Sequence, residues 1–127
     1  MNGTKIVLDT NAAIKLLEKQ FILTSLGLNI DEAQFFTSVI VRMELLSKRE
    51  MQEEEKQRIM SFLGDLTVLP LDEAIECKAI EIRRTTKLKL PDSIIAATSI
   101  VLDAILFTND DRLLSFSWPG YKVIALP

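Results

Sequence analysis

Short apolar segments of strand length alternate along the chain with longer segments that have helical spacing. The apolar segments are rich in β-branched and aromatic residues, as buried strands are. Strands that are apolar on both faces and separated by helices form a parallel sheet covered by helices. The pattern therefore predicts an α/β fold with a central, mostly parallel sheet flanked by helices. The strands are predicted at residues 5–8, 34–37, 68–71, 105–108 and 122–125.

The helical segments are predicted at residues 11–17, 38–48, 51–63, 72–86, 91–102 and 111–115. Residues 21–30 have the least clear pattern and could form a short helix closed by Gly27. Phe21, Ile22, Leu26 and Leu28 offer an apolar surface there, which could bind a partner or close the protein's own core. Because the 127 residues contain no repeat and no linker, we expect one domain over residues 1–127.

The chain contains no histidine. Its absence excludes Ser-His-Asp triads, Cys-His pairs, histidine-based ribonuclease chemistry and His-ligated zinc. The single cysteine, Cys77, excludes an internal disulfide, and we expect it to be packed within an amphipathic helix. Any catalysis must therefore use carboxylates or lysines.

The sequence has neither a secretory signal nor an apolar stretch long enough to span a membrane. We therefore expect a cytoplasmic protein with no membrane partner. Its 15 basic and 18 acidic residues give a net charge of −3, which argues against holding nucleic acid by charge alone.

Two candidate site residues follow predicted strands. Asp9 comes after residues 5–8 and Asp110 after residues 105–108, at the carboxyl ends where α/β sheets build their sites. Each could instead cap the helix that follows it. Asp111 duplicates the second acid, so the sequence leaves open which of Asp110 and Asp111 faces the site.

Two further acids lie on predicted helices. Glu44 shares an apolar helix face, where an unpaired carboxylate costs several kcal/mol unless a metal or solvent reaches it. Asp92 follows Pro91 in a first turn, where it favours the helix dipole, and small residues beyond it leave room for a ligand. Clustered carboxylates repel one another unless cations neutralise them, and oxygen-only ligands suit Mg²⁺ or Mn²⁺.

These residues resemble a known family when they are taken together. Leu8-Asp9-Thr10-Asn11, Glu44, Leu90-Pro91-Asp92 and Thr108-Asn109-Asp110 resemble the PIN-domain ribonucleases, above all the VapC-type toxins of toxin–antitoxin pairs. The resemblance covers essentially the whole chain, in the same order and with similar spacing.

The resemblance implies a PIN-like fold and a metal-dependent endoribonuclease. It makes Asp9, Glu44 and Asp92 ligands of Mg²⁺ or Mn²⁺, and Asp110 the more variable fourth acid. It also implies an RNA substrate, a cognate antitoxin whose arginine reaches the carboxylates, and a homodimer. The basic residues between Arg83 and Lys89 would guide RNA or favour the end of their helix.

Two other functions stay open on the sequence. A phospho-acceptor signalling domain of the receiver type is also a small α/β domain with strand-end aspartates. It needs an acceptor aspartate after a mid-chain strand, whereas residues 51–60 form a charged helical segment here. A non-catalytic PIN-like RNA-binding scaffold is the second alternative.

Overall fold

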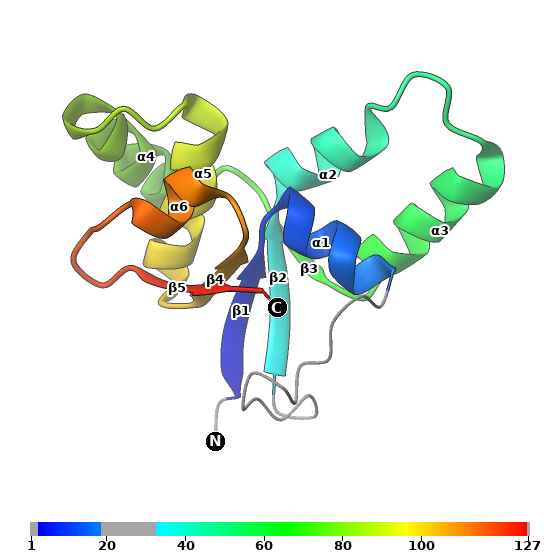
Figure 1. Cartoon of the computed structure of the whole chain (residues 1–127), viewed down its shortest axis with the longest axis horizontal. Helices are drawn as coiled ribbons and strands as arrows, with labels where there is room; N and C mark the ends of the chain where they lie inside the picture. The colour runs from blue at the N-terminus through cyan, green and yellow to red at the C-terminus, as the bar shows by residue number, and fades with distance from the viewer. Residues whose placement is uncertain (1–2, 19–32, 127) are drawn as a thin grey trace.

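Five parallel strands form the central sheet, in the order β3-β2-β1-β4-β5 (Figure 1). The computed structural model describes residues 3–18 and 33–126. Within that part the strands are β1 (Thr4–Leu8), β2 (Ala33–Ser38), β3 (Thr67–Leu69), β4 (Ile105–Thr108) and β5 (Lys122–Ala125). The predicted α/β fold with a parallel sheet is therefore confirmed.

Helices lie on both sides of the strands in Figure 1, with α1 to α3 on one side and α4 to α6 on the other. Their bounds agree with the predicted segments to within about two residues at each end. The predicted segment at residues 21–30 lies outside the described residues. The helices are α1 (Thr10–Leu17), α2 (Val39–Leu46), α3 (Glu53–Gly64), α4 (Glu73–Thr85), α5 (Leu90–Leu102) and α6 (Asp111–Ser115).

Polar residues that precede the helices fix where four of them begin. The side chains of Asp9, Ser38, Asp72 and Asp110 each accept a hydrogen bond from a backbone N–H in the first turn of α1, α2, α4 and α6. These bonds satisfy N–H groups that have no partner within the helix. Two of the caps, Asp9 and Asp110, are also candidate site residues.

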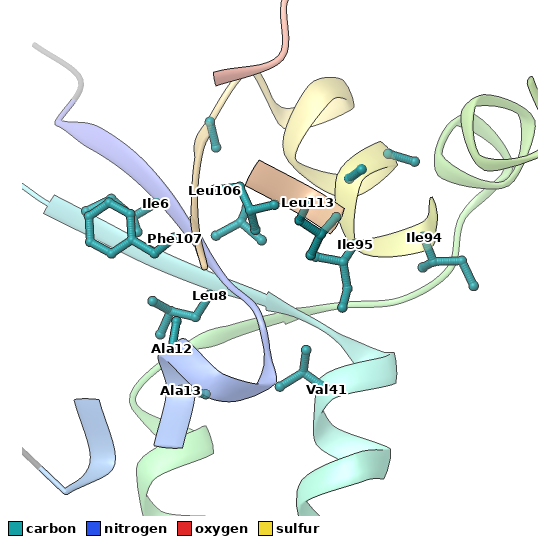
Figure 2. Packing of buried hydrophobic residues seen from close by; sticks show 14 of the residues in the cluster. Ile6, Leu8, Ala12, Ala13, Val41, Ile94, Ile95, Leu106, Phe107 and Leu113 are labelled. Carbon is teal, nitrogen blue, oxygen red and sulfur yellow. The ribbon is translucent and has the colours of Figure 1, made fainter. Parts of the chain in front are cut away.

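The core fills both sides of β1 and β4, which are buried strands in the middle of the sheet. Leu8 pairs with Phe107 across these strands, and both lie on the side that Ala12 of α1 covers (Figure 2). On the other side, Leu106 lies beside Leu113 of α6, with Ile95 of α5 next to Leu113. Because both faces are covered, the two strands are fixed in position and so are the residues that follow them.

Two further expectations concern single features. Cys77 is exposed on α4, so the expectation of a packed thiol is wrong. The helical pattern predicts that Cys77 lies on a helix, but it does not show whether Cys77 is on the face that packs against the core or on the face exposed to solvent. In the described part of the chain, no helix has the length and apolar character needed to cross a membrane.

Candidate active site

The order of the strands defines a crevice at the carboxyl ends of β1 and β4. The chain adds β2 and β3 on one side of β1, and later adds β4 and β5 on its other side. Adjacent connections then leave in opposite directions, which opens a ligand-binding crevice in α/β sheets. Asp9 follows β1, and Thr108 ends β4 directly beside it.

Asp9 is held at this crevice by both of its carboxylate oxygens. Oδ1 accepts the backbone N–H of Ala12 at 2.8 Å, and Oδ2 accepts the hydroxyl of Thr108. The residue is 4% exposed. Burial raises the pKa of the Asp9 carboxyl, and the two hydrogen bonds oppose that rise. Asp9 is therefore both a helix cap and a preoriented carboxylate.

Thr108 connects Asp9 to the segment that carries Asp110. Its oxygen accepts the backbone N–H of Asp110 at 2.9 Å, so its one hydroxyl proton is free to go to Asp9. The threonine is fully buried. It therefore fixes the distance between the two strand-end aspartates.

Asp92 lies in the first turn of α5 and completes the group of three aspartates. Its side chain is 16% exposed. Burial raises the pKa of the Asp92 carboxyl, and the nearby charge of Asp110 raises it further, while Arg112 and Lys89 lower it. Asp92 and Asp110 also raise the pKa of Asp9. The structure thus brings Asp9, Asp92 and Asp110 within electrostatic reach of one another.

Asp110, rather than Asp111, faces the other two aspartates. Asp111 is exposed at the start of α6. The Arg112 side chain donates to Asp110 from Nε at 3.3 Å and from Nη2 at 3.1 Å, and this pairing lowers the pKa of the Asp110 carboxyl. The same Nη2 lies 3.9 Å from Oδ2 of Asp92. One guanidinium therefore lies between the two carboxylates.

Glu44 is placed differently from the expectation. It is exposed on α2, so the predicted burial on an apolar face is wrong, because that face of α2 is not covered at this position. Within the described residues its carboxylate forms neither a hydrogen bond nor an ion pair. It lines a hollow of about 290 Å³ between α1, α2 and α3, together with Thr10, Ile14, Leu45 and Ile59.

Thr10, which follows Asp9 in the chain, lines this hollow, whereas Asp9, Asp92 and Asp110 do not. The Thr10 hydroxyl oxygen is buried and has no hydrogen-bond partner. Buried polar atoms of this kind are rare and call for a ligand or water. Glu44 therefore shares this hollow with Thr10, the neighbour of Asp9 in the chain.

The aspartates fit a hydrated divalent ion better than a closed metal cage. Their donors are all oxygen, and burial together with mutual repulsion disfavours the charged forms of Asp9 and Asp92. No three acidic side chains lie close enough to form a preformed cage in the described ranges. An ion such as Mg²⁺, which keeps several waters, suits this open arrangement.

The basic residues from the end of α4 to the start of α5 have different roles: one holds the turn, and others are exposed to solvent. Nη1 of Arg83 donates to the carbonyl of Leu88 at 2.7 Å, so this arginine holds the turn that leads to α5. Lys87 and Lys89 are exposed, and Lys89 acts on the charge of Asp92. Lys87 and Lys89 are therefore exposed cations near the site, whereas Arg83 is held by the turn.

Two contributors to the site have little or no signal in the sequence for the contacts that they make. The bridging position of Arg112 had only a weak signal, its place two residues after Asp110 at a helix start. Tyr121 donates its hydroxyl to the carbonyl of Leu113 at 2.7 Å and so braces α6. Burial raises the pKa of Tyr121 well above its usual range, and Asp9 and Asp110 raise it further. No local pattern in the sequence signals this contact.

The family assignment follows from comparison with known proteins. The PIN domain family model matches residues 6–118, and the chain belongs to the PIN domain family. None of the curated proteins gives a significant match to the sequence.

Solved structures of similar fold come from toxin–antitoxin complexes. A chain of VapBC2 from Rickettsia felis, bound to a DNA fragment from its promoter, has a TM-score of 0.79 at 21% identity and covers 96% of this chain and 98% of its own. DNA-bound VapBC from Salmonella typhimurium has a TM-score of 0.76 at 24% identity, with the same coverage. A toxin–antitoxin complex from Klebsiella pneumoniae has a TM-score of 0.72 at 26% identity and covers 94% of this chain and 95% of its own. The resemblance to VapC-type PIN domains is thus confirmed at the level of family and fold.

Proposed function

We propose that this protein is a Mg²⁺- or Mn²⁺-dependent endoribonuclease that acts as the toxin of a toxin–antitoxin pair. The observation that carries the proposal is the group of three partly or fully buried aspartates at the crevice between β1 and β4. The chain has no histidine, and a metal held by carboxylates is the chemistry that this group of residues would supply for phosphodiester hydrolysis.

The residues of the site have distinct roles in this proposal. Asp9 and Asp92 would hold the ion, Asp110 would support it, and Glu44 would join from α2 through water or a side-chain rotation. Bound Mg²⁺ or Mn²⁺ lowers the pKa of a coordinated water and neutralises charge that develops on the phosphoryl group. Thr108 and the Ala12 N–H keep Asp9 in one orientation, so its geometry is set before substrate arrives.

RNA would approach across the exposed lysines that precede α5. Lys87 and Lys89 lie at the entrance to this helix, and Lys89 is near Asp92. Their charges would contact backbone phosphates and make binding weaker at higher salt concentration. A net charge of −3 does not oppose such binding once a divalent ion neutralises part of the aspartate charge.

The receiver alternative is excluded by the fold. A receiver domain has the flavodoxin-like strand order 2-1-3-4-5, whereas this sheet has the order β3-β2-β1-β4-β5 and the chain is a PIN domain. An activity assay distinguishes the nuclease from the second alternative, a non-catalytic PIN-like RNA-binding scaffold.

The assay uses a labelled RNA oligonucleotide with purified wild-type protein, Asp9→Asn and Asp103→Asn. Asp103 is a matched control because it is an exposed aspartate outside the site, with a left-handed backbone that asparagine tolerates. We expect wild type and Asp103→Asn to cleave RNA with Mg²⁺ or Mn²⁺ and to stop on chelation. Asp9→Asn should fold and lose cleavage. Metal-independent cleavage, or full activity of Asp9→Asn at limiting Mg²⁺, would contradict the proposal.

The antitoxin would bind in the hollow between α1, α2 and α3. The similar structures are toxin–antitoxin complexes, and this hollow is lined by Ile14, Leu17 and Leu45 beside Glu44. An amphipathic helix could cover these apolar residues and extend an arginine toward the carboxylates. The earlier candidate surface formed by Phe21, Ile22, Leu26 and Leu28 lies outside the described residues.

Co-expression with a neighbouring gene tests this part of the proposal. We expect a stable complex with little ribonuclease activity, and sedimentation of the isolated nuclease should give the mass of a homodimer. A complex that keeps full activity would contradict inhibition at the active site, and a monomeric mass would contradict the dimer.

A further inference from the structure

Arg112 is the one basic side chain in the described part of the chain that forms ion pairs with the candidate site aspartates. Its Nη2 lies 3.1 Å from Asp110 Oδ2 and 3.9 Å from Asp92 Oδ2. Its Nε lies 3.3 Å from the other Asp110 oxygen. The guanidinium therefore occupies the space between two carboxylates that a divalent ion would also need.

We propose that the Arg112 guanidinium exchanges between these carboxylates and a phosphate of the RNA backbone. In the metal-free protein it holds Asp92 and Asp110 together. When a divalent ion binds there, the guanidinium leaves and contacts the substrate strand next to the site. This inference rests on the proposed nuclease function and assigns a role to a residue outside the acidic set.

The geometry allows the exchange without unfolding α6. Oδ1 of Asp110 also accepts the backbone N–H of Arg112 at 2.9 Å, and this bond is the N-cap of the helix. The cap does not depend on the guanidinium, so the helix keeps its start when the side chain moves. The Arg112 side chain is 55% exposed, so solvent and substrate can reach it.

The charges favour a phosphate as the new partner. Asp9, Asp92 and Asp110 carry three negative charges, and Arg112 with a divalent ion would supply three positive ones. A guanidinium displaced from a carboxylate retains its planar pair of donors, which fits phosphate oxygens equally well. An exposed ion pair is weak enough to be replaced by a stronger ligand interaction.

The test measures binding rather than cleavage. Mn²⁺ affinity is determined by titration calorimetry for wild type, Arg112→Ala, Arg112→Lys and Lys89→Ala. Lys89→Ala is the matched control for the Mn²⁺ affinity alone, because it also removes a positive charge near Asp92 but makes no ion pair with it. Binding of a 2′-O-methyl oligoribonucleotide is then measured with saturating Mn²⁺. Thermal melting confirms that each variant is folded.

We expect Arg112→Ala to bind Mn²⁺ up to about thirtyfold more tightly than wild type, the effect of removing one unit charge about 4 Å from a doubly charged ion in a solvated site. Lys89→Ala should show a smaller change. The oligoribonucleotide should bind several-fold more weakly to Arg112→Ala. Arg112→Lys should lie between wild type and Arg112→Ala in both measurements, since it keeps the charge without the paired donors.

Each outcome decides between the two proposals. Unchanged Mn²⁺ affinity in Arg112→Ala, a change no larger than in Lys89→Ala, or unchanged oligoribonucleotide affinity would overturn the role of Arg112 and leave the nuclease intact. If neither wild type nor Arg112→Ala binds Mn²⁺, both proposals fail. If Arg112→Ala alone binds Mn²⁺, the competition is supported directly.

Discussion

Asp9 caps α1 with one carboxylate oxygen and holds Thr108 with the other. A single buried carboxylate thereby joins the start of a helix to the end of a neighbouring strand. Asp110 also caps a helix, α6, and pairs with Arg112. Capping and site formation are not alternatives at these positions, because a carboxylate has more acceptor sites than either role uses.

At this scale we predict that Asp92→Asn stabilises the metal-free protein at pH 7. The pKa of Asp92 is raised in the folded state, so its ionised form costs stability above that pKa. The gain should shrink as the pH falls through the raised pKa toward the ordinary value of 3.8, because the wild-type carboxyl then takes up its own proton.

Thermal melting between pH 7 and pH 4 measures this effect. Glu44→Gln is the matched control, and it should change the melting temperature little because Glu44 is exposed. An increase in melting temperature for Asp92→Asn that grows toward pH 4 would contradict a raised pKa of Asp92 in the folded protein.

Local sequence patterns predict the positions of candidate site residues at strand ends better than the positions of those on helix faces. Asp9 and Asp110 follow strands whose apolar pattern is unambiguous, so their place was predictable. Glu44 was misplaced because helical periodicity shows which residues share a face, but not how far neighbouring elements cover it. The pairing of Arg112 with Asp92 joins α6 to α5 and has no local signature.

At the scale of elements, the connection between β4 and α6 determines the geometry of the site. Thr108 ends the strand, and its hydroxyl contacts Asp9 on one side and the Asp110 N–H on the other. Asn109 accepts the backbone N–H of Leu126 at 2.9 Å and ties the same connection to the end of β5. Three consecutive polar residues thus hold one turn in place.

We predict that Thr108→Val destabilises the protein by about 1–3 kcal/mol, because it leaves buried partners without their hydrogen bonds and keeps the side-chain shape. Thr98→Val is the matched control. Thr98 is equally buried, but its hydroxyl donates only to a carbonyl one helical turn earlier. Urea unfolding measures both variants.

The Thr108→Val substitution should also change the metal site, in addition to its effect on stability. Asp9 loses a hydrogen bond that favours its charged form, so its pKa should rise further in Thr108→Val and Mn²⁺ should bind more weakly. Equal stabilities for the two variants, with unchanged Mn²⁺ binding, would argue against Thr108 as the link between the aspartates.

At the scale of the whole molecule, the parallel sheet brings together residues that lie about a hundred positions apart. The alternation of strands and helices predicted the parallel sheet and its helical layers. It did not predict the strand order, because that order depends on long-range packing among strands that are all apolar. The crevice between β1 and β4 follows from that order.

We predict that Phe107→Ala costs about 3–5 kcal/mol of the unfolding free energy, the usual effect of removing a large buried ring. Phe107 is fully buried in β4 and is the largest such side chain among the described residues. Val101→Ala, at an exposed position on α5, should cost less than about 1 kcal/mol. Similar losses of unfolding free energy for the two variants in urea would contradict the assignment of Phe107 in β4 to the core.

The claim that the aspartates bind a divalent metal is tested most directly by crystals of the protein grown with Mn²⁺. Anomalous scattering locates the ion in these crystals. We predict one main peak at the crevice, within ligand distance of Asp9 and Asp92, with the Arg112 guanidinium moved away from Asp92. No peak at the aspartates in crystals saturated with Mn²⁺, or a main peak at another part of the surface, would contradict the claim that these residues form a metal-dependent nuclease site.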